Sequence, residues 1–255
     1  MKKYKYYTGE NGVRKRMPID LASRLNLNYL ALTNKTNKVG EFDLPEIVCN
    51  TEVFPDYIVG YSNPGNYHKS PNTAVAWYQF DDTFDGIDGL YNAIYYNDKK
   101  LLEKYKKRFK GVKFFISPDY SEMGDVDVIE NLYRAKKARV VSIWLTVELG
   151  AIVIPNITFP RVEDILLYLR GYENCTVVAF STMCYIDDRK EREYLKEAVK
   201  KTVDYLNLKA IVVYDVCKSN DAVYEVFEYA INKGIKIIIP PNNLKVRNAV
   251  NKEAV

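Results

Sequence analysis

The feature that most constrains the fold of this chain is a regular alternation after residue 111. Short, unbroken apolar runs rich in β-forming residues predict strands at 112–117, 151–155, 176–181, 210–214 and 236–239. Between them, helical periodicity predicts helices at 125–150, 162–170, 191–206 and 222–232, and glycines end several of these helices. Strands that are apolar throughout, with connections long enough for a crossover, are typical of a parallel sheet with helices on both faces.

The N-terminal half is less regular. Strands are expected at 46–49, 57–61 and 74–80, but the gaps between them hold no convincing crossover helix, and helical sequence returns only at 88–109. The total of eight strands leaves two α/β architectures open: an open, mostly parallel sheet, or a (β/α)8-like barrel with an irregular N-terminal half. We expect a basic N-terminal arm at 1–20, a single α/β domain at 21–241 and a C-terminal tail at 242–255.

Cysteine and histidine usage excludes several classes of protein. The four cysteines show no CxxC spacing, which favours a reduced, cytoplasmic setting. The single histidine, His68, argues against histidine-rich zinc sites and most histidine-based catalytic triads. We find no apolar stretch near the ~20 residues that a membrane helix needs, and we expect neither a secretory signal nor a membrane partner.

Charge is unevenly distributed. The net charge is only +4, but lysines and arginines cluster within residues 2–16 and again within residues 99–110. Eleven of the 37 cations are arginine, the residue best shaped to grip phosphate in two places. A solvated lysine surface is the simpler interpretation of both clusters, and a non-specific nucleic-acid-binding face is the alternative.

Candidate site residues follow the predicted strands, because the carboxyl ends of parallel strands meet at one edge of a sheet. Catalytic roles are expected for Asp119, Asn156 and Asp215, and Asp119 and Asn156 should lie within one pocket. The expected ligand-binding residues are Ser117, Ser121, Asn131, Arg134, Ser181, Thr182, Asp81 and Asp82. These oxygen-rich side chains could coordinate Mg²⁺ or bind a nucleotide or sugar, although the acidic ones also suit helix capping.

Standard catalytic and phosphate-binding motifs are missing from the sequence. It contains no Gly-x-x-x-x-Gly-Lys-Ser/Thr loop, no Gly-x-Gly-x-x-Gly after a strand, and no Gly-x-Ser-x-Gly elbow. These absences argue against a P-loop enzyme, a dinucleotide-binding enzyme and a hydrolase of the α/β type.

Three segments carry a resemblance to a known family: Phe115-Ile-Ser-Pro-Asp-Tyr-Ser121, Asn131-Leu-Tyr-Arg134 and Gly150-Ala-Ile-Val-Ile-Pro-Asn156. Together they resemble the bacterial and phage family catalogued as domain of unknown function 4417. The resemblance implies a protein of a phage, plasmid or other mobile element, and no particular activity. It points to six of the residues above: Ser117, Asp119, Ser121, Asn131, Arg134 and Asn156. The chain departs from the family pattern at Thr182-Met183-Cys184, where a glycine is usual, and at Asp215, where a small residue is usual.

Two hypotheses for function follow. In the first, a mobile-element protein binds or acts on a nucleotide or a nucleic-acid phosphate through a carboxylate-rich pocket at the carboxyl ends of the strands. In the alternative, the protein is not catalytic and binds a host protein, which the missing catalytic motifs favour.

Overall fold

The structure is a computed structural model that describes residues 6–8, 14–16, 25, 27–217 and 219–246. Most of the predicted N-terminal arm and residues 247–255 of the predicted tail therefore lie outside the described residues. Within the arm, β1 (Tyr6–Thr8) and β2 (Arg14–Arg16) pair as a short antiparallel ribbon.

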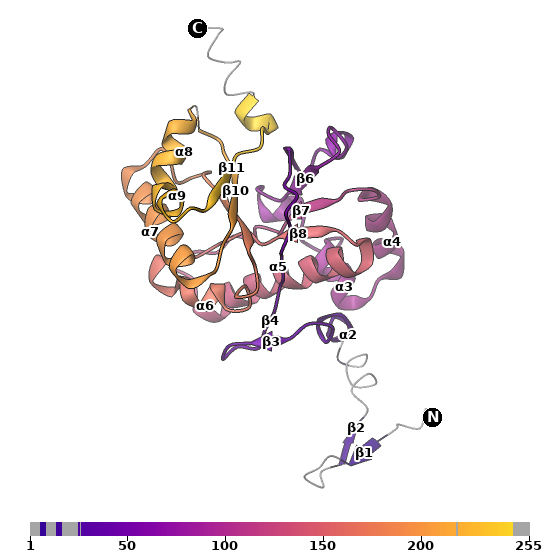
Figure 1. Ribbon diagram of the computed structural model, residues 1–255. Coiled ribbons are helices and arrows are strands. Elements are labelled where there is room, and N and C mark those ends of the chain that lie inside the picture. Colours follow the sequence, from indigo (N-terminus) through magenta and orange to yellow (C-terminus); the bar gives the residue numbers. More distant parts are fainter. Residues whose placement is uncertain (1–5, 9–13, 17–24, 26, 218, 247–255) are drawn as a thin grey trace.

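Seven parallel strands form the centre of the fold (Figure 1). One sheet contains, in this order, β5 (Tyr57–Gly60), β6 (Thr73–Ala76), β7 (Phe114–Ile116) and β8 (Ile152–Ile154). The other contains β9 (Val177–Ser181), β10 (Ala210–Tyr214) and β11 (Lys236–Ile238), with β10 in the middle. Every pairing in these two sheets is parallel, so the prediction of an α/β fold with parallel sheets is confirmed.

The two sheets are joined at both of their edges by isolated parallel bridges. Beyond β8, Asn156 pairs with Ala179 of β9, and the Ala179 amide donates to the Pro155 carbonyl at 2.7 Å. On the other side, Ile58 of β5 pairs with Asn242, and the Ile58 amide donates to the Pro241 carbonyl at 3.0 Å. Backbone pairing in each sheet thus continues, through one isolated bridge at each edge, into the other sheet.

The predicted strand at 46–49 is wrong. An antiparallel pair, β3 (Lys38–Val39) with β4 (Leu44–Pro45), ends just before it. The Ile47 amide donates to Gly171, and the Cys49 carbonyl accepts from Thr176 and Val177. These hydrogen bonds are isolated and do not follow the regular pattern of a ladder, so residues 46–49 do not form a strand.

Helices connect the parallel strands largely as predicted. They are α2 (Leu30–Thr33), α3 (Leu90–Tyr96), α4 (Lys99–Arg108), α5 (Val128–Leu149), α6 (Ile165–Leu169), α7 (Arg189–Tyr205), α8 (Asn220–Val226) and α9 (Glu228–Asn232). Short 3-10 turns lie at η1 (Pro64–Asn66), η2 (Asp81–Thr83) and η3 (Val162–Asp164).

Two predicted helices are interrupted. The helix expected at 88–109 breaks because Asn97 takes a left-handed conformation with φ of 53° and Asp98 caps a new helix, accepting from the Leu101 amide at 3.0 Å. The helix expected at 222–232 divides at Phe227, whose side chain is fully buried.

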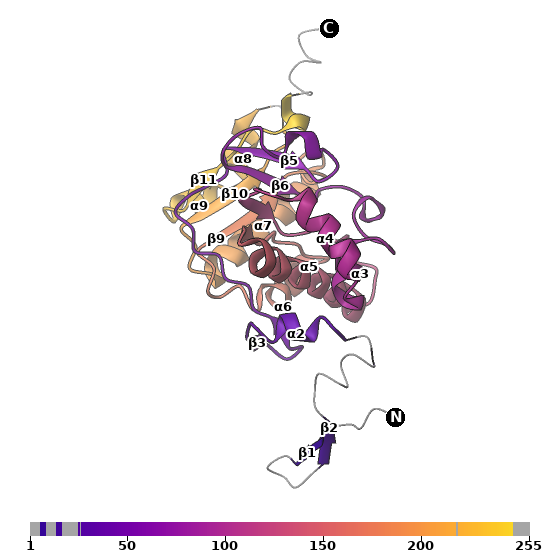
Figure 2. The ribbon, with the colours of Figure 1, turned by 90° about the vertical axis from the view of Figure 1, so that its right-hand side faces the viewer.

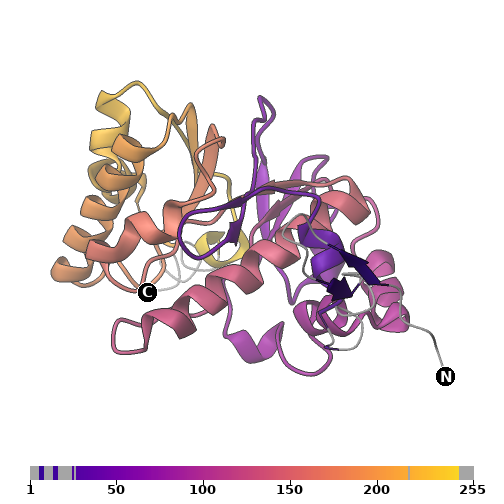
Figure 3. The same ribbon diagram turned by 90° about the horizontal axis from the view of Figure 1, so that it is seen from below.

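The layers are visible in two views. In Figure 1, α3 and α4 lie on one side of β5–β8, and α7, α8 and α9 lie on the opposite side, next to β10 and β11. The view from below in Figure 3 likewise has the strands between these two groups of helices, with α5 crossing underneath. All residues of β6, β7 and β10 are buried, which fits strands covered on both faces.

Candidate functional site

A cleft of about 880 Å³ lies at the carboxyl ends of β6, β7, β8 and β9. Its volume falls in the range of small-molecule sites, roughly 300–1,000 Å³. Residues that follow each of the four strands contribute to its wall, as the sequence predicts for a parallel sheet. The lining residues are Tyr78, Gln79, Phe80, Asp119, Tyr120, Ser121, Glu122, Asn156, Ile157, Thr158, Phe159, Pro160, Phe180, Ser181, Met183, Cys184, Tyr185, Glu191 and Leu195.

At the centre of the wall, Asn156 holds Asp119. The Asn156 side-chain nitrogen donates to Asp119 Oδ1 at 2.9 Å, and its oxygen accepts from the Tyr78 hydroxyl at 2.8 Å. The Asn156 backbone amide donates to Ser117 Oγ at 2.7 Å. These bonds fix the amide orientation, so the predicted proximity of Asp119 and Asn156 is confirmed. Ser117 is buried behind the wall and supports Asn156 rather than lining the cleft.

The environment of Asp119 disfavours its charged form. Burial raises the pKa of Asp119 from 3.8 to about 7, the nearby Asp81 carboxylate adds to the rise, and the hydrogen bond from Asn156 opposes it. A carboxyl group with a pKa near 7 exchanges protons readily at neutral pH, which is the property required of a general acid or base.

A second carboxyl group, Glu122, lies in the same wall. Its Oε2 atom is buried and has no hydrogen-bond partner among the described residues. Burial raises the pKa of Glu122 well above its usual value; a hydrogen bond from Thr158 opposes this rise, and the charge of Asp119 reinforces it. Burial of both groups, reinforced at Glu122 by the charge of Asp119, therefore keeps a proton on this pair at pH values where exposed carboxyl groups have lost theirs.

The loop that carries both carboxyl groups is tied to α5 and η2. Asp81 accepts from the Ser121 amide at 3.1 Å and from its hydroxyl at 3.0 Å. Arg134 donates both to Asp81, at 3.1 Å, and to the Ser121 carbonyl, at 3.0 Å. The buried Asn131 side chain accepts a hydrogen bond from the Met123 amide and donates one to the Met123 carbonyl. Asp81, Arg134 and Asn131 thus position the loop, and of the predicted residues in this group only Ser121 reaches the cleft.

The other predicted residues divide between the cleft and the core. Ser181 lines the cleft, where its hydroxyl accepts from the Met183 amide at 3.1 Å. Thr182 and Asp215 are fully buried and do not line it. Asp215 accepts from the Cys217 amide at 2.7 Å and from Thr182 Oγ1 at 3.3 Å, and it forms an ion pair with Lys245. These contacts give Asp215 a structural role at the end of β10.

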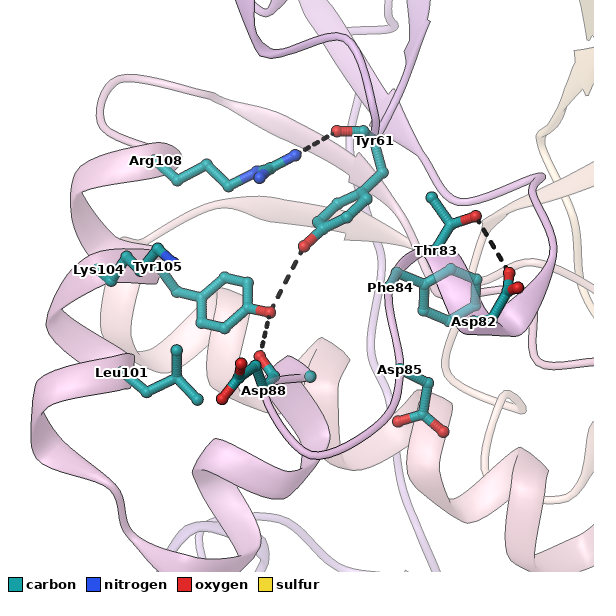
Figure 4. Close-up of a pocket in the computed structure, with 11 residues that line it drawn as sticks. Tyr61, Asp82, Thr83, Phe84, Asp85, Asp88, Leu101, Lys104, Tyr105 and Arg108 are labelled. Atoms are coloured by element: carbon teal, nitrogen blue, oxygen red, sulfur yellow. Dashed lines mark hydrogen bonds between the residues drawn. The ribbon is translucent and has the colours of Figure 1, made fainter.

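Asp82 lies in a different, smaller pocket of about 350 Å³ (Figure 4). The close-up shows Asp82 and Thr83 on one side of this pocket and the α4 residues Tyr105 and Arg108 on the other. Arg108 donates to the Tyr61 carbonyl at 2.6 Å, so its guanidinium group points inward. Asp82 is exposed and accepts only a long, 3.4 Å bond from Thr83 in the described part of the chain.

Sequence reasoning missed several lining residues, of which Glu122, Tyr78 and Cys184 matter most. The spacing Asp119-x-x-Glu122, in a loop directly after a strand, was the available signal for the carboxyl pair. Cys184 is exposed and has a positive φ of 71°, whereas the other three cysteines are buried. Nothing in the local sequence shows that Cys184 faces the cleft, because the turn after β9 determines its direction.

The cleft wall is acidic and aromatic. It contains the carboxyl groups of Asp119, Glu122 and Glu191, and none of the described residues that line it is Lys, Arg or His. Phe159 stacks on Tyr185, with 5.8 Å between ring centroids, and Phe80 is 85% exposed at the edge of the cleft. The arrangement suits a ligand with a flat apolar face and several polar groups, and it does not suit a free anion.

Two acidic side chains of the cleft have the chemistry of magnesium ligands. Asp119 and Glu122 carry oxygen atoms of the kind that Mg²⁺ prefers. However, the described residues contain no group of three or more His, Cys, Asp or Glu side chains arranged to hold a metal ion.

No helix in the described part of the chain combines the length and the apolar character needed to cross a membrane.

Comparison with known proteins identifies the family. A search of curated proteins finds no match. The profile of the domain of unknown function DUF4417 matches residues 36–230, which include every strand that contributes to the cleft. The match covers most of the chain, and it includes the segments around Asp119 and Asn156 on which the resemblance depends. The chain therefore belongs to the DUF4417 family.

Proposed function

We propose that this protein is an enzyme that binds a nucleoside or nucleotide in the cleft and hydrolyses it. Water attacks as a bond of the ligand breaks, Asp119 gives its proton to the leaving atom, and a proton of the attacking water returns to Asp119. The observation that carries the proposal is the hydrogen bond between Asn156 and Asp119 in a wall where Asp119 has a pKa of about 7. Asn156 orients the carboxyl group, and burial keeps a substantial fraction of it protonated near neutral pH. A fixed, protonated carboxyl group is suited to general acid catalysis.

The lining supports recognition of the base and the sugar rather than direct recognition of the phosphate. A base could stack against Phe80 or against the Phe159–Tyr185 pair. Ribose hydroxyls or exocyclic amines could donate to Glu122 and Glu191. A phosphate inside the cleft would face carboxyl groups without a cation, so we propose that it lies at the mouth or is accompanied by Mg²⁺.

We also propose that the seven parallel strands close into a barrel. Bridges at both edges support this, because they continue the neighbour order from β8 to β9 and from the end of β11 back to β5. In such a barrel all strands direct their carboxyl ends to one mouth, where active sites of α/β barrels lie. The cleft would then occupy part of that mouth.

The exposed thiol of Cys184 allows a direct test of ligand binding. Iodoacetamide should alkylate Cys184 in the folded protein, since the other three cysteines are buried. The four ribonucleosides and their 5′-monophosphates are added in turn, with and without Mg²⁺, and the alkylation rate is measured by mass spectrometry. We expect at least one nucleoside to slow alkylation without Mg²⁺. If none of the nucleosides or nucleotides slows it, the proposed ligand class is wrong.

The same ligands then test catalysis, with products detected by chromatography. Asp119→Asn should retain protection of Cys184 but lose on the order of 10²–10⁴-fold in turnover. Asp82→Asn, a matched change outside the cleft, should retain both. Because Asp119 acts in its protonated form, wild-type kcat/KM should fall as the pH rises above about 7. Full turnover by Asp119→Asn would reject the catalytic role of Asp119. Absence of turnover of every ligand by the wild type would instead leave the alternative proposal, a non-catalytic protein that binds a host protein.

A further inference from the structure

The most uneven charge distribution in the described structure lies on and just after α4. Residues 99–113 contain seven lysines and one arginine against a single acidic residue, Glu103. This segment has a net charge of +7, whereas the whole chain has +4, which leaves −3 for all other residues. A local field of this kind attracts polyanions even when the total charge is small.

The structure separates these cations into two groups. Arg108 faces inward, where its guanidinium group lies 4.2 Å from the centre of the Tyr61 ring, and Lys106 pairs with Glu148 at 2.8 Å. The other six are exposed and form no ion pair with a carboxylate of the described residues. Four of them lie on α4, and we name these the α4 lysine face: Lys99, Lys100, Lys104 and Lys107. Lys110 and Lys113 follow the helix.

The α4 lysine face is accessible. Figure 2 shows α4 on the side of the molecule turned toward the viewer, beside α3. The apolar residues of the helix point the other way: Leu101 and Leu102 pack partly buried against the core, and Tyr105 is buried. The outer face of α4 therefore presents charge with no apolar side chain to insert into a lipid surface, which amphipathic membrane-binding helices require.

We propose that the α4 lysine face binds the phosphate backbone of a nucleic-acid duplex without regard to sequence. Lysines act as point charges toward phosphate and lack the planar fork with which arginine recognises guanine. A ten-residue helix is about 15 Å long, which is comparable to about four phosphate steps along one strand at 3.4 Å each. This proposal does not depend on the chemistry of the cleft.

The test compares two triple variants of equal charge change. Lys100→Gln/Lys104→Gln/Lys107→Gln removes three charges from the face, and Lys35→Gln/Lys38→Gln/Lys200→Gln removes three exposed charges elsewhere. Glutamine has nearly the helix propensity of lysine, so α4 should persist, which circular dichroism can verify. Binding to fluorescent 30-base-pair DNA and RNA duplexes is measured by anisotropy between 50 and 200 mM NaCl.

We expect the wild-type association constant to fall linearly with salt on a logarithmic plot, with a slope of about −0.9 for each phosphate contacted. The α4 variant should bind about tenfold or more weakly at 50 mM NaCl, and its slope should be shallower by roughly 2 to 3. The control variant should resemble the wild type. Absence of duplex binding at 50 mM NaCl, or equal weakening in both variants, would overturn the proposal. Binding to phosphatidylserine vesicles without binding to either duplex would also overturn it.

Discussion

Replacing Asp119 by asparagine should stabilise the protein, and the gain should grow with pH. The carboxyl group lies in a buried wall near Asp81, so the folded protein disfavours its charge. Asparagine has the same shape and keeps an oxygen that can accept the 2.9 Å hydrogen bond from Asn156. The substitution therefore removes the cost of ionisation and leaves the packing of the wall almost unchanged.

The magnitude follows from the two pKa values of Asp119, 3.8 in an exposed chain and about 7 in the folded protein. Because the folded value is the higher one, the native state binds more protons between these values, and wild-type stability falls as the pH rises through this range. At about 1.36 kcal/mol per pKa unit, the variant should gain about 1.7 kcal/mol at pH 5 and about 4 kcal/mol at pH 9. Above pH 8 the gain should be nearly constant.

Urea unfolding of both proteins at pH 5, 7 and 9, followed by tryptophan fluorescence, gives the required free energies of unfolding. Asp82→Asn provides the control: this residue is exposed, so its replacement should change stability by less than about 0.5 kcal/mol at each pH. A difference between wild type and Asp119→Asn that stays constant from pH 5 to pH 9 would refute the electrostatic account. So would destabilisation by the variant at pH 9.

Three further predictions concern other parts of the structure. Asn131→Ala should lower the free energy of unfolding in urea by about 2–3 kcal/mol, because it leaves backbone groups of Met123 without their partner. A loss below about 0.5 kcal/mol would contradict the positioning role of Asn131. Asp215→Asn should cost about 3 kcal/mol, since it leaves the Lys245 charge without its buried partner, and Asp215→Asn/Lys245→Met should recover part of that loss in the same assay. In the folded protein, iodoacetamide should modify one cysteine per chain, Cys184, as read by mass spectrometry of the intact protein and its peptides; modification of two or more sites under native conditions would contradict the burial of the others.

Much of the fold could be predicted from local sequence. The strand at 210–214 was predicted with its observed limits, because an apolar run between two helical stretches leaves few alternatives. The break at Asn97 was not predicted, since one residue in a left-handed conformation hardly disturbs the apolar periodicity on either side. The strand predicted at 46–49 is not formed. An extended, apolar segment becomes a strand only beside a continuous partner strand, and its own sequence does not show whether such a partner exists.

The sequence predicts only those residues of the candidate site whose position is determined by the end of a strand. Asp119 and Asn156 each follow a strand, so the parallel direction of β7 and β8 suffices to bring them together. Asp215 also follows a strand and was predicted to be catalytic, but its partner Lys245 lies 30 residues later in a segment predicted to be a tail. Glu122 was missed because its position depends on the path of the loop, which Asn131 holds by contacts that local sequence does not reveal.

The bridge between Ile58 and Asn242 has a consequence for synthesis of the chain. Its two residues are 184 positions apart, so β5 acquires its partner on that side only after 184 further residues have been translated. At about 5–20 residues per second, the interval is roughly 10–40 s. During this time the β5 backbone on that side has no partner and could pair with a strand of another nascent chain. A chain truncated before residue 242 would therefore be prone to aggregate through β5.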